Sequence, residues 1–352
     1  MTRRLKPAPT FHSYLTLSAR AILAVLLLAS AHAQDLTPSA YISFDAPNAG
    51  TASGQGTSPA AINRHGWIGG TVRDSAYVPH GFLRSRDGVF ITIDPPTSVQ
   101  TFVSAINAYN EVVGHFYSAT ASHGFVRDAG GNYKLLDVPG ATSTTPSGIN
   151  DTAVVVGVAN DASGAHGFLW DAQHRYTVFD VPGAKSGTTY PVGINQNGVV
   201  TGFYFDTDND SHGFVRNQAG SFTTFVADVN GTQTQSAAIN ASGQITGWTN
   251  DGLGDTYGFL RNAEGGLGLF GVSGSPGNTA TDINDHGVIV GYIFSDAGGE
   301  ASFERDQAGN ITVISLPFSN TNNVPVGINL YGQITGFYTD PTGVNHGWEG
   351  VQ

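Results

Sequence analysis

The sequence predicts an all-β fold, a seven-bladed β-propeller of four-stranded blades. Three observations lead to this fold class. A cassette of residues recurs about every 44 positions, each recurrence contains four short strand-like segments, and the two ends of the chain complete one another. A fixed period in this range is typical of repeat folds, and repeats of four antiparallel strands can close into a propeller.

The period is set by an asparagine that follows an isoleucine in every copy of the cassette. Successive copies are 43 to 45 residues apart. A glycine stands seven residues after each asparagine, where it predicts close approach of another backbone or of an aromatic ring. The asparagines are Asn63, Asn107, Asn150, Asn195, Asn240, Asn284 and Asn329, and the glycines are Gly70, Gly114, Gly157, Gly202, Gly247, Gly291 and Gly336.

Each period predicts four strands, illustrated by the fifth copy. The first covers 236–240 and ends in the asparagine, whose side chain can accept a hydrogen bond from the backbone two residues on. Gly243 then suits the fourth position of a type I turn. The second strand covers 244–248, and a longer polar loop leads to the third, 257–261. A glycine-rich turn precedes the fourth strand, 267–270.

The third strand carries one aromatic residue in every copy, which we expect in the core between neighbouring sheets. No segment after the N-terminal region sustains the 3.6-residue apolar period of a helix. The aromatic residues are Phe82, Phe125, Phe168, Phe214, Phe259, Phe303 and Trp348.

The two ends of the chain predict closure. The last copy stops after the third strand, at 346–352, while 41–47 resembles the fourth-strand segment 176–182 and precedes the first asparagine. An open solenoid would leave both edges exposed. We therefore expect the N-terminal strand to complete the last blade.

The N-terminus predicts export. Basic residues precede an apolar run at 21–29, and small residues precede Gln34, as in a cleaved signal peptide covering 1–33. The apolar run is too short to span a bilayer, which needs about 20 residues. The domain is then 34–352, with no membrane span, located in the periplasm or outside the cell.

Charge and composition exclude several partner classes. The 27 acidic and 11 basic residues of 34–352 leave a formal charge of −16, which argues against nucleic acid as a partner. Cysteine is absent, so stability in an oxidising compartment must come from burial. We expect a monomer.

The repeated motifs Gly-Ile-Asn, Val-Gly or Thr-Gly, His-Gly-Phe and Asp-Val-Pro-Gly resemble the bacterial extracellular repeats of the HAF family, over residues 41–348. The signature histidine is absent from two copies, which have Tyr257 and Ala301 in its place. The resemblance implies an exported repeat protein and brings no catalytic activity with it.

The most specific internal pattern is a histidine and an aspartate 14 residues apart. In a hairpin, residues symmetric about the turn are cross-strand neighbours, so the two side chains should meet. A His–Asp pair can serve a general base, but no nucleophile recurs beside these pairs. We expect structural pairs that tie two strands together: His80 with Asp94, His123 with Asp137, His166 with Asp180 and, through closure, His346 with Asp45.

Two further groups of charged residues have alternative interpretations. Arginine recurs two residues after the third-strand aromatic, either as a basic patch or, as we expect, packed on aromatic rings with its head paired to a carboxylate. The arginines are Arg84, Arg127, Arg216, Arg261 and Arg305. Asp206, Asp208 and Asp210 alternate in one loop, which suits calcium or a solvated turn. No other cofactor is expected.

The sequence therefore favours a non-catalytic binding or scaffold protein for a glycan or a protein ligand. The longer loops between strands two and three, and between one blade and the next, share one face, so we expect the ligand there or at the mouth of the central channel. The alternative is a glycan lyase or hydrolase that acts at the channel mouth.

Overall fold

The computed structural model describes residues 40–227, 233–252, 254–294, 299–319 and 322–351. The chain divides into two compact parts, Met1–Thr37 and Pro38–Gln352, and all described residues belong to the second. The predicted signal peptide, 1–33, lies outside the described residues.

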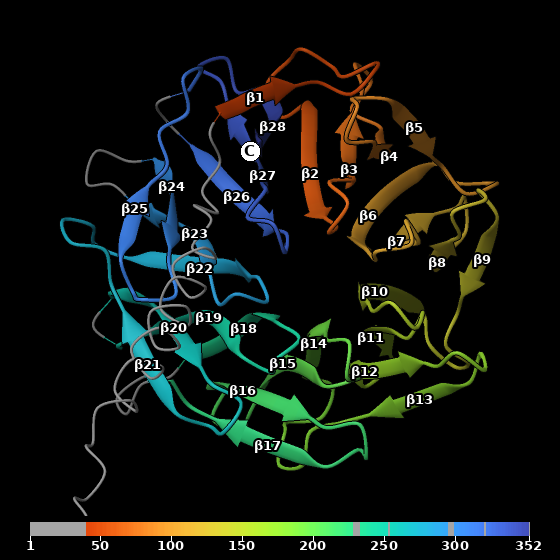
Figure 1. The fold of residues 1–352 in the computed structure, drawn as a ribbon. Coiled ribbons are helices and arrows are strands. Elements are labelled where there is room, and N and C mark those ends of the chain that lie inside the picture. The colour runs from red at the N-terminus through yellow and green to blue at the C-terminus, as the bar shows by residue number, and fades with distance from the viewer. Residues whose placement is uncertain (1–39, 228–232, 253, 295–298, 320–321, 352) are drawn as a thin grey trace, which may run out of the picture. The chain divides into compact units, whose positions relative to one another are not determined.

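The described residues form 28 strands and no helix, which confirms the all-β prediction (Figure 1). Consecutive groups of four strands are antiparallel, and we number these groups as units along the chain. Their bounds are: unit one, β2 Gly56–Ile62, β3 Ile68–Arg73, β4 Pro79–Arg84, β5 Phe90–Ile93; unit two, β6 Gln100–Ile106, β7 Val112–Tyr117, β8 Ser122–Arg127, β9 Tyr133–Leu136; unit three, β10 Ser143–Ile149, β11 Val155–Asp161, β12 Gly164–Trp170, β13 Tyr176–Phe179.

The later units repeat the same plan. Their bounds are: unit four, β14 Thr189–Ile194, β15 Val200–Phe205, β16 Ser211–Arg216, β17 Phe222–Phe225; unit five, β18 Gln233–Ile239, β19 Ile245–Asn250, β20 Thr256–Arg261, β21 Leu267–Phe270; unit six, β22 Asn278–Ile283, β23 Ile289–Phe294, β24 Glu300–Arg305, β25 Ile311–Val313. The closing unit contains β26 Asn323–Ile328, β27 Ile334–Thr339, β28 Asn345–Val351 and, from the other end of the chain, β1 Ala40–Phe44.

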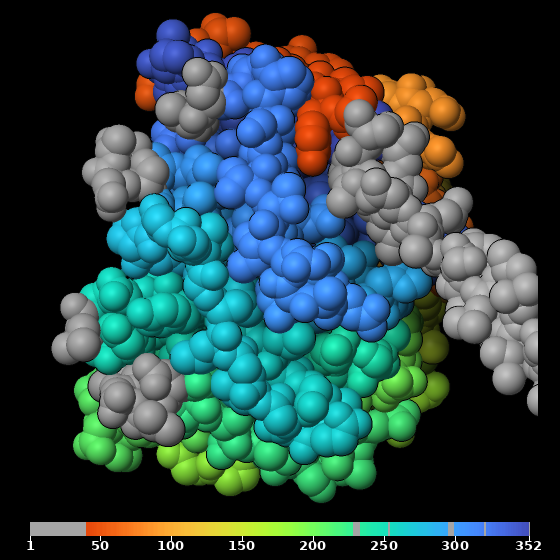
Figure 2. Space-filling view, turned by 60° about the vertical axis from the view of Figure 1, so that its left-hand side comes forward, coloured from red at the N-terminus to blue at the C-terminus, as the bar shows by residue number. Residues whose placement is uncertain are grey.

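The expected pairing of the two chain ends is present. Strand β1 is antiparallel to β28, with Phe44 opposite Gly347 and Ser43 opposite Trp348. The Phe44 ring covers Gly347, and Tyr41 meets Trp348 edge to face at 5.8 Å. In Figure 2 the red N-terminal residues of the described part lie against the blue C-terminal ones. The first strand thus takes the place of a fourth strand in the closing unit.

Neighbouring units are joined by side-chain packing and by single parallel bridges. Such a bridge links the start of a third strand to the start of the next unit's first strand, as between Ser211 and Gln233 and between Gly56 and Asn345. Two bridges of this kind join pairs of units into eight-stranded sheets. The third-strand aromatics, Phe168 and Phe259 among them, are fully buried, as predicted.

The glycine of each second strand is explained by two close neighbours. A Cβ placed on Gly157 would lie 2.7 Å from Cα of Pro146 and 2.8 Å from the ring of Phe168. Both predicted causes, a backbone and an aromatic ring, therefore act at once. In the described part of the chain, no helix is long and apolar enough to cross a membrane.

Candidate functional site

The recurring asparagine builds the turn between the first and second strands. Oδ1 of Asn195 accepts hydrogen bonds from the backbone N–H groups of Asn197 and Val199, both at 3.0 Å. The first of these bonds is the one that the sequence predicts. Gly198 completes the turn with a φ of 71°, a conformation that glycine adopts without strain.

The other end of the same amide reaches the neighbouring unit. Nδ2 of Asn195 donates to the backbone carbonyl of Asn240 at 3.1 Å, and the equivalent bond recurs from unit to unit. The last one, from Asn329 to the carbonyl of Asn63, returns to the start at 3.0 Å. All seven asparagines are buried. They form a closed cycle of hydrogen bonds, which the remaining members complete: Asn63 to Asn107, Asn107 to Asn150, Asn150 to Asn195, Asn240 to Asn284 and Asn284 to Asn329.

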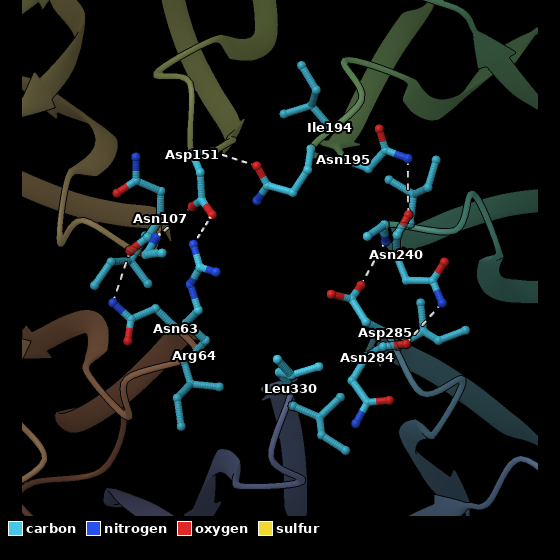
Figure 3. Close-up of a pocket in the computed structure, with 18 of the residues that line it drawn as sticks. Asn63, Arg64, Asn107, Asp151, Ile194, Asn195, Asn240, Asn284, Asp285 and Leu330 are labelled. Atoms are coloured by element: carbon cyan, nitrogen blue, oxygen red, sulfur yellow. Dashed lines mark hydrogen bonds and ion pairs between the residues drawn. The ribbon is translucent and has the colours of Figure 1, made fainter.

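A cavity of about 260 Å³ opens inside this cycle (Figure 3). The isoleucines that precede the asparagines form an apolar collar: Ile62, Ile106, Ile149, Ile194, Ile239, Ile283 and Ile328. The residue after each asparagine, which we call the rim position, also lines the cavity. The rim residues are Arg64, Ala108, Asp151, Gln196, Ala241, Asp285 and Leu330. The cavity therefore lies at the end of the channel formed by the short turns, not by the longer loops.

Polar rim side chains bind their neighbours around the cavity. Oδ1 of Asp151 accepts from the backbone N–H of Ala108 at 2.9 Å, and its Oδ2 pairs with the guanidinium of Arg64. Oε1 of Gln196 accepts from the N–H of Asp151 at 2.9 Å, and Oδ1 of Asp285 accepts from the N–H of Ala241 at 2.8 Å. A rim oxygen of one unit thus caps the rim N–H of the unit before it.

The structure brings together all four predicted His–Asp pairs. In each, Nδ1 of the histidine lies within hydrogen-bonding distance of the carboxylate: 2.8 Å for His80 and Asp94, 3.0 Å for His123 and Asp137, 2.9 Å for His166 and Asp180, and 3.0 Å for His346 and Asp45. The pairs stand in separate units, and none of them lines the central cavity.

Sequence reasoning missed a second carboxylate on the other side of several histidines. Nε2 of His212 lies 2.7 Å from Asp206, and Nε2 of His166 lies 3.2 Å from Asp161. The corresponding distances are 3.7 Å for His80 and Asp74 and 3.6 Å for His346 and Asp340. The signal was available, because an aspartate stands five or six residues before each of these histidines.

At these sites the pKa of His166 and the pKa values of the second carboxylates are shifted. Burial lowers the pKa of His166, but the hydrogen bonds and charges of Asp180 and Asp161 outweigh it, so the net shift is upward. The hydrogen bond from His212 lowers the pKa of Asp206. The pKa of Asp340 falls to about 2, chiefly because its carboxylate accepts from the backbone of Val344. Asp206 and Asp340 are thus held as anions beside their histidines.

A second cavity, of about 300 Å³, lies at the loop end of unit one. His80, Asp94 and Asp74 line it together with Asn48 and Phe90. Oδ1 of Asp94 is buried and has no hydrogen-bond partner among the described residues. One of the predicted pairs therefore faces a cavity on the side of the molecule where the sequence places the ligand.

The recurring arginines differ in part from the prediction. Arg84 fulfils it, since its guanidinium lies 4.5 Å from the centre of the Phe44 ring and pairs with Glu349 at 2.8 Å, where both side chains are buried. Arg216 lies over Phe179 at 5.0 Å but donates to the carbonyl of Asn217. Arg127, Arg261 and Arg305 also donate to the following carbonyl. In these four arginines the guanidinium group therefore donates to a nearby backbone carbonyl in place of the expected carboxylate.

The acidic loop of unit four is organised by its own hydrogen bonds. Oδ1 of Asp206 accepts from the backbone N–H groups of Asp208 and Asp210, and Oδ2 accepts from His212. Among the residues that the structure describes, no group of three histidine, cysteine or acidic residues is arranged to hold a metal ion. The predicted calcium ligands Asp206, Asp208 and Asp210 also do not line the central cavity.

One acidic residue near the channel was not singled out by the sequence. Asp282 stands where other units have alanine or glycine, and it accepts hydrogen bonds from the backbone of Ile283 and of Ile328, both at 2.8 Å. Part of its surface still meets solvent, but surrounding protein raises its pKa to about 7, and the nearby charge of Asp285 adds to the shift.

The fold resembles that of known β-propellers. TolB from Acinetobacter baumannii is 10% identical, with a TM-score of 0.51, and the match covers 73% of this chain but 64% of TolB, less than two thirds of its length. The β-propeller domain of the Trilobed protease from Pyrococcus furiosus is 9% identical, with a TM-score of 0.55, covering 85% of this chain and 94% of that domain.

A lectin gives a similar match. BP39L from Burkholderia pseudomallei is 13% identical, with a TM-score of 0.53, covering 82% of this chain and 94% of the lectin. No protein-family model matches the sequence, and no curated protein matches it. At these identities the similarity establishes a propeller-like fold and leaves function to the site itself.

Proposed function

We propose that this chain is a seven-bladed β-propeller of the HAF type, exported through its signal peptide 1–33 to the periplasm or the exterior. It acts there as a monomeric, non-catalytic binding protein for a glycan or a protein ligand. The pairing of β1 with β28 and the closed asparagine cycle support the blade count. The fold it shares with a lectin and with TolB is compatible with a binding role.

The rim of the central cavity carries the proposal. Isoleucine and asparagine are the same in every unit, whereas the rim position that follows them changes from basic to acidic, amide, small and apolar. Among the three repeat positions that line the cavity, only the rim position varies, which suits ligand recognition, while the constant isoleucine and asparagine maintain the frame. The rim carboxylates Asp151 and Asp285 accept hydrogen bonds from the protein itself.

The proposal is tested by a glycan array and a polysaccharide turnover screen, using the full chain expressed with its own N-terminus and collected after export. We expect binding of at least one glycan and no turnover. Robust hydrolysis or elimination would overturn the non-catalytic assignment. Recovery of the protein only in the cytoplasm, with its N-terminus intact, would overturn the assignment of export.

One observation favours the alternative, a glycan-active lyase or hydrolase. His80 and Asp94 form a potential general-base pair and both line the cavity of unit one. If the enzyme reading is right, His80→Ala and Asp94→Ala abolish turnover, whereas His123→Ala, in an equivalent pair outside that cavity, leaves it intact. Equal activity in all three variants would exclude this site.

A further inference from the structure

We propose that the arc of the rim formed by Asp285, Leu330 and Arg64 is a binding site for the end of a neutral sugar. The inference rests on the proposed binding function and names its ligand class. It follows from an incomplete pattern of hydrogen bonds around the central cavity (Figure 3). In the part of the chain that the structure describes, rim oxygens cap three of the seven rim N–H groups, and of the four that lack a cap, at Gln196, Asp285, Leu330 and Arg64, the last three are consecutive.

The complete part of the pattern shows what these N–H groups need. The N–H groups of Ala108, Asp151 and Ala241 each donate to an oxygen from the rim side chain of the following unit, at 2.8 to 2.9 Å. The asparagine side chain does not compete for these donors, because its oxygen binds the N–H groups two and four positions on. Each rim N–H is therefore available to an oxygen placed beside it.

Three consecutive rim N–H groups lack such an oxygen. The residues that would cap Asp285, Leu330 and Arg64 are Leu330, Arg64 and Ala108, and none of these side chains contains an acceptor. Within the described ranges, the three N–H groups have no protein acceptor. Leu330 lies between the other two on the rim (Figure 3). The arc thus offers a row of donors beside an apolar collar.

The charges around the arc select a neutral ligand. Among the described residues that line the cavity, Arg64 alone is basic, and its guanidinium is paired with Asp151. Asp285 adds a carboxylate whose Oδ2 has no hydrogen-bond partner in the described part of the chain, and Asp282 lies close to it. An anionic ligand would be repelled by these groups.

A sugar hydroxyl fits both requirements. It accepts from a backbone N–H and donates to a carboxylate at the same time. Different hydroxyls of one pyranose can bind a donor of the arc and Asp285, while the C–H faces of the ring contact the isoleucine collar. The cavity volume of about 260 Å³ suits one terminal sugar residue and not a long chain.

The test caps the N–H groups of the arc with side chains introduced by mutation. Leu330→Asn and Ala108→Asn introduce an oxygen at the same distance from the backbone as the capping oxygens of Asp151 and Asp285, and so should cap the N–H groups of Asp285 and Arg64. Tyr109→Asn is the matched control, because it adds the same amide at the exposed neighbour of Ala108, which does not line the cavity. Binding is measured by calorimetry with methyl glycosides of glucose, galactose, mannose and N-acetylglucosamine, and with methyl glucuronide as the charged comparison.

We expect at least one neutral glycoside to bind, and each arc variant to weaken it about tenfold, the effect of losing one hydrogen bond of about 1.4 kcal/mol. The control should stay within about twofold. Hydrogen exchange of the Asp285 amide reports whether the cap has formed in Leu330→Asn. Absence of capping overturns the proposed geometry, and capping without loss of affinity overturns the site.

Three other outcomes separate this inference from the proposed function. Glycan binding that is equal in wild type, both arc variants and the control keeps the protein a glycan-binding propeller but rejects the rim site. Preference for the glucuronide over the neutral glycosides rejects the ligand class. Failure of every glycan to bind the wild type rejects the glycan function as well.

Discussion

Units three and five pack the same position of the third strand differently: unit three has a histidine there and unit five does not. In unit three, His166 lies between Asp180 and Asp161, so one imidazole joins the outer strand and the loop. In unit five the corresponding residues are Tyr257 and Gly271, and the Tyr257 ring lies 3.6 Å from the position of a Cβ on Gly271. An aromatic ring over a glycine replaces a polar pair at the same site.

What the two units share is the aromatic packing against glycine. The rings of Phe168 and Phe259 lie under the glycines of the second strands, and both are fully buried. The fourth strand repeats the arrangement in both units, where an aromatic ring covers the third-strand glycine, as the hairpin register predicts. The comparison indicates that each unit depends on the packing of an aromatic ring against a glycine. The His–Asp pair is an addition to this packing.

The largest effect is expected from removing the buried aromatic ring that both units share. Phe168→Ala and Phe259→Ala should each cost about 3–5 kcal/mol of unfolding free energy, because each removes a fully buried ring and leaves a cavity. Denaturant unfolding measures both. A cost in unit five much smaller than in unit three would show that the ring is not the common support of the two units.

Filling the space beneath the ring should cost less. A Cβ on Gly157 would lie 2.7 Å from Cα of Pro146, and one on Gly247 would lie 2.9 Å from Cα of Ser236. We expect Gly157→Ala and Gly247→Ala to lower the unfolding free energy by about 1–3 kcal/mol each, since backbone atoms cannot move aside freely. Gly268→Ala is the control, because nothing lies within 4 Å of its Cβ position. A similar loss in the control would remove the steric explanation.

Exchanging the paired residues between units three and five should transfer the pH dependence of stability from one unit to the other. The raised pKa of His166 gives stability that is fully present below the unfolded histidine pKa, about 6.5, and is lost as the pH rises through the folded value. The difference in melting temperature between wild type and the double variant His166→Tyr with Asp180→Gly should therefore shrink as the pH rises from 6 to 9. Asp282, with a pKa of about 7, titrates in the same window but is present in both proteins.

The reverse exchange provides the control for that experiment. Tyr257→His with Gly271→Asp should install a pair in unit five and make the melting temperature fall more steeply with pH than in wild type. If the melting temperatures of all three proteins change with pH in parallel, the His–Asp pair makes no pH-dependent contribution to stability.

The smallest expected effect concerns the acidic loop of unit four. Oxygens of Asp206 are already engaged by two backbone N–H groups and by His212, which leaves Asp208 and Asp210 as the carboxylates open to calcium. Calcium usually takes six or more oxygens. We expect the melting temperature with excess calcium and with chelator to agree. A chelator-dependent fall that Asp208→Asn abolishes would establish a calcium site instead.

Local register explains why much of the fold and of the His–Asp pairs could be predicted. A hairpin places residues symmetric about its turn opposite one another, so His166 and Asp180 meet whatever the rest of the chain does. The second carboxylate followed from an equally local spacing and could have been found in the same way. The pairing of the two chain ends was predictable because the segment 41–47 resembles the fourth strand that the last copy lacks.

The sequence by itself determined the period, the strands, the glycine and ring positions and the partners within each hairpin, because these depend on short-range geometry that every copy repeats. Only the tertiary structure decided which residues meet between units. The cycle of asparagine amides, the pairing of Arg64 with Asp151 across 87 positions, and the uncapped N–H groups at Leu330 and its neighbours arise from how one unit is placed beside the next. No single repeat contains that placement, so no single repeat could reveal the rim.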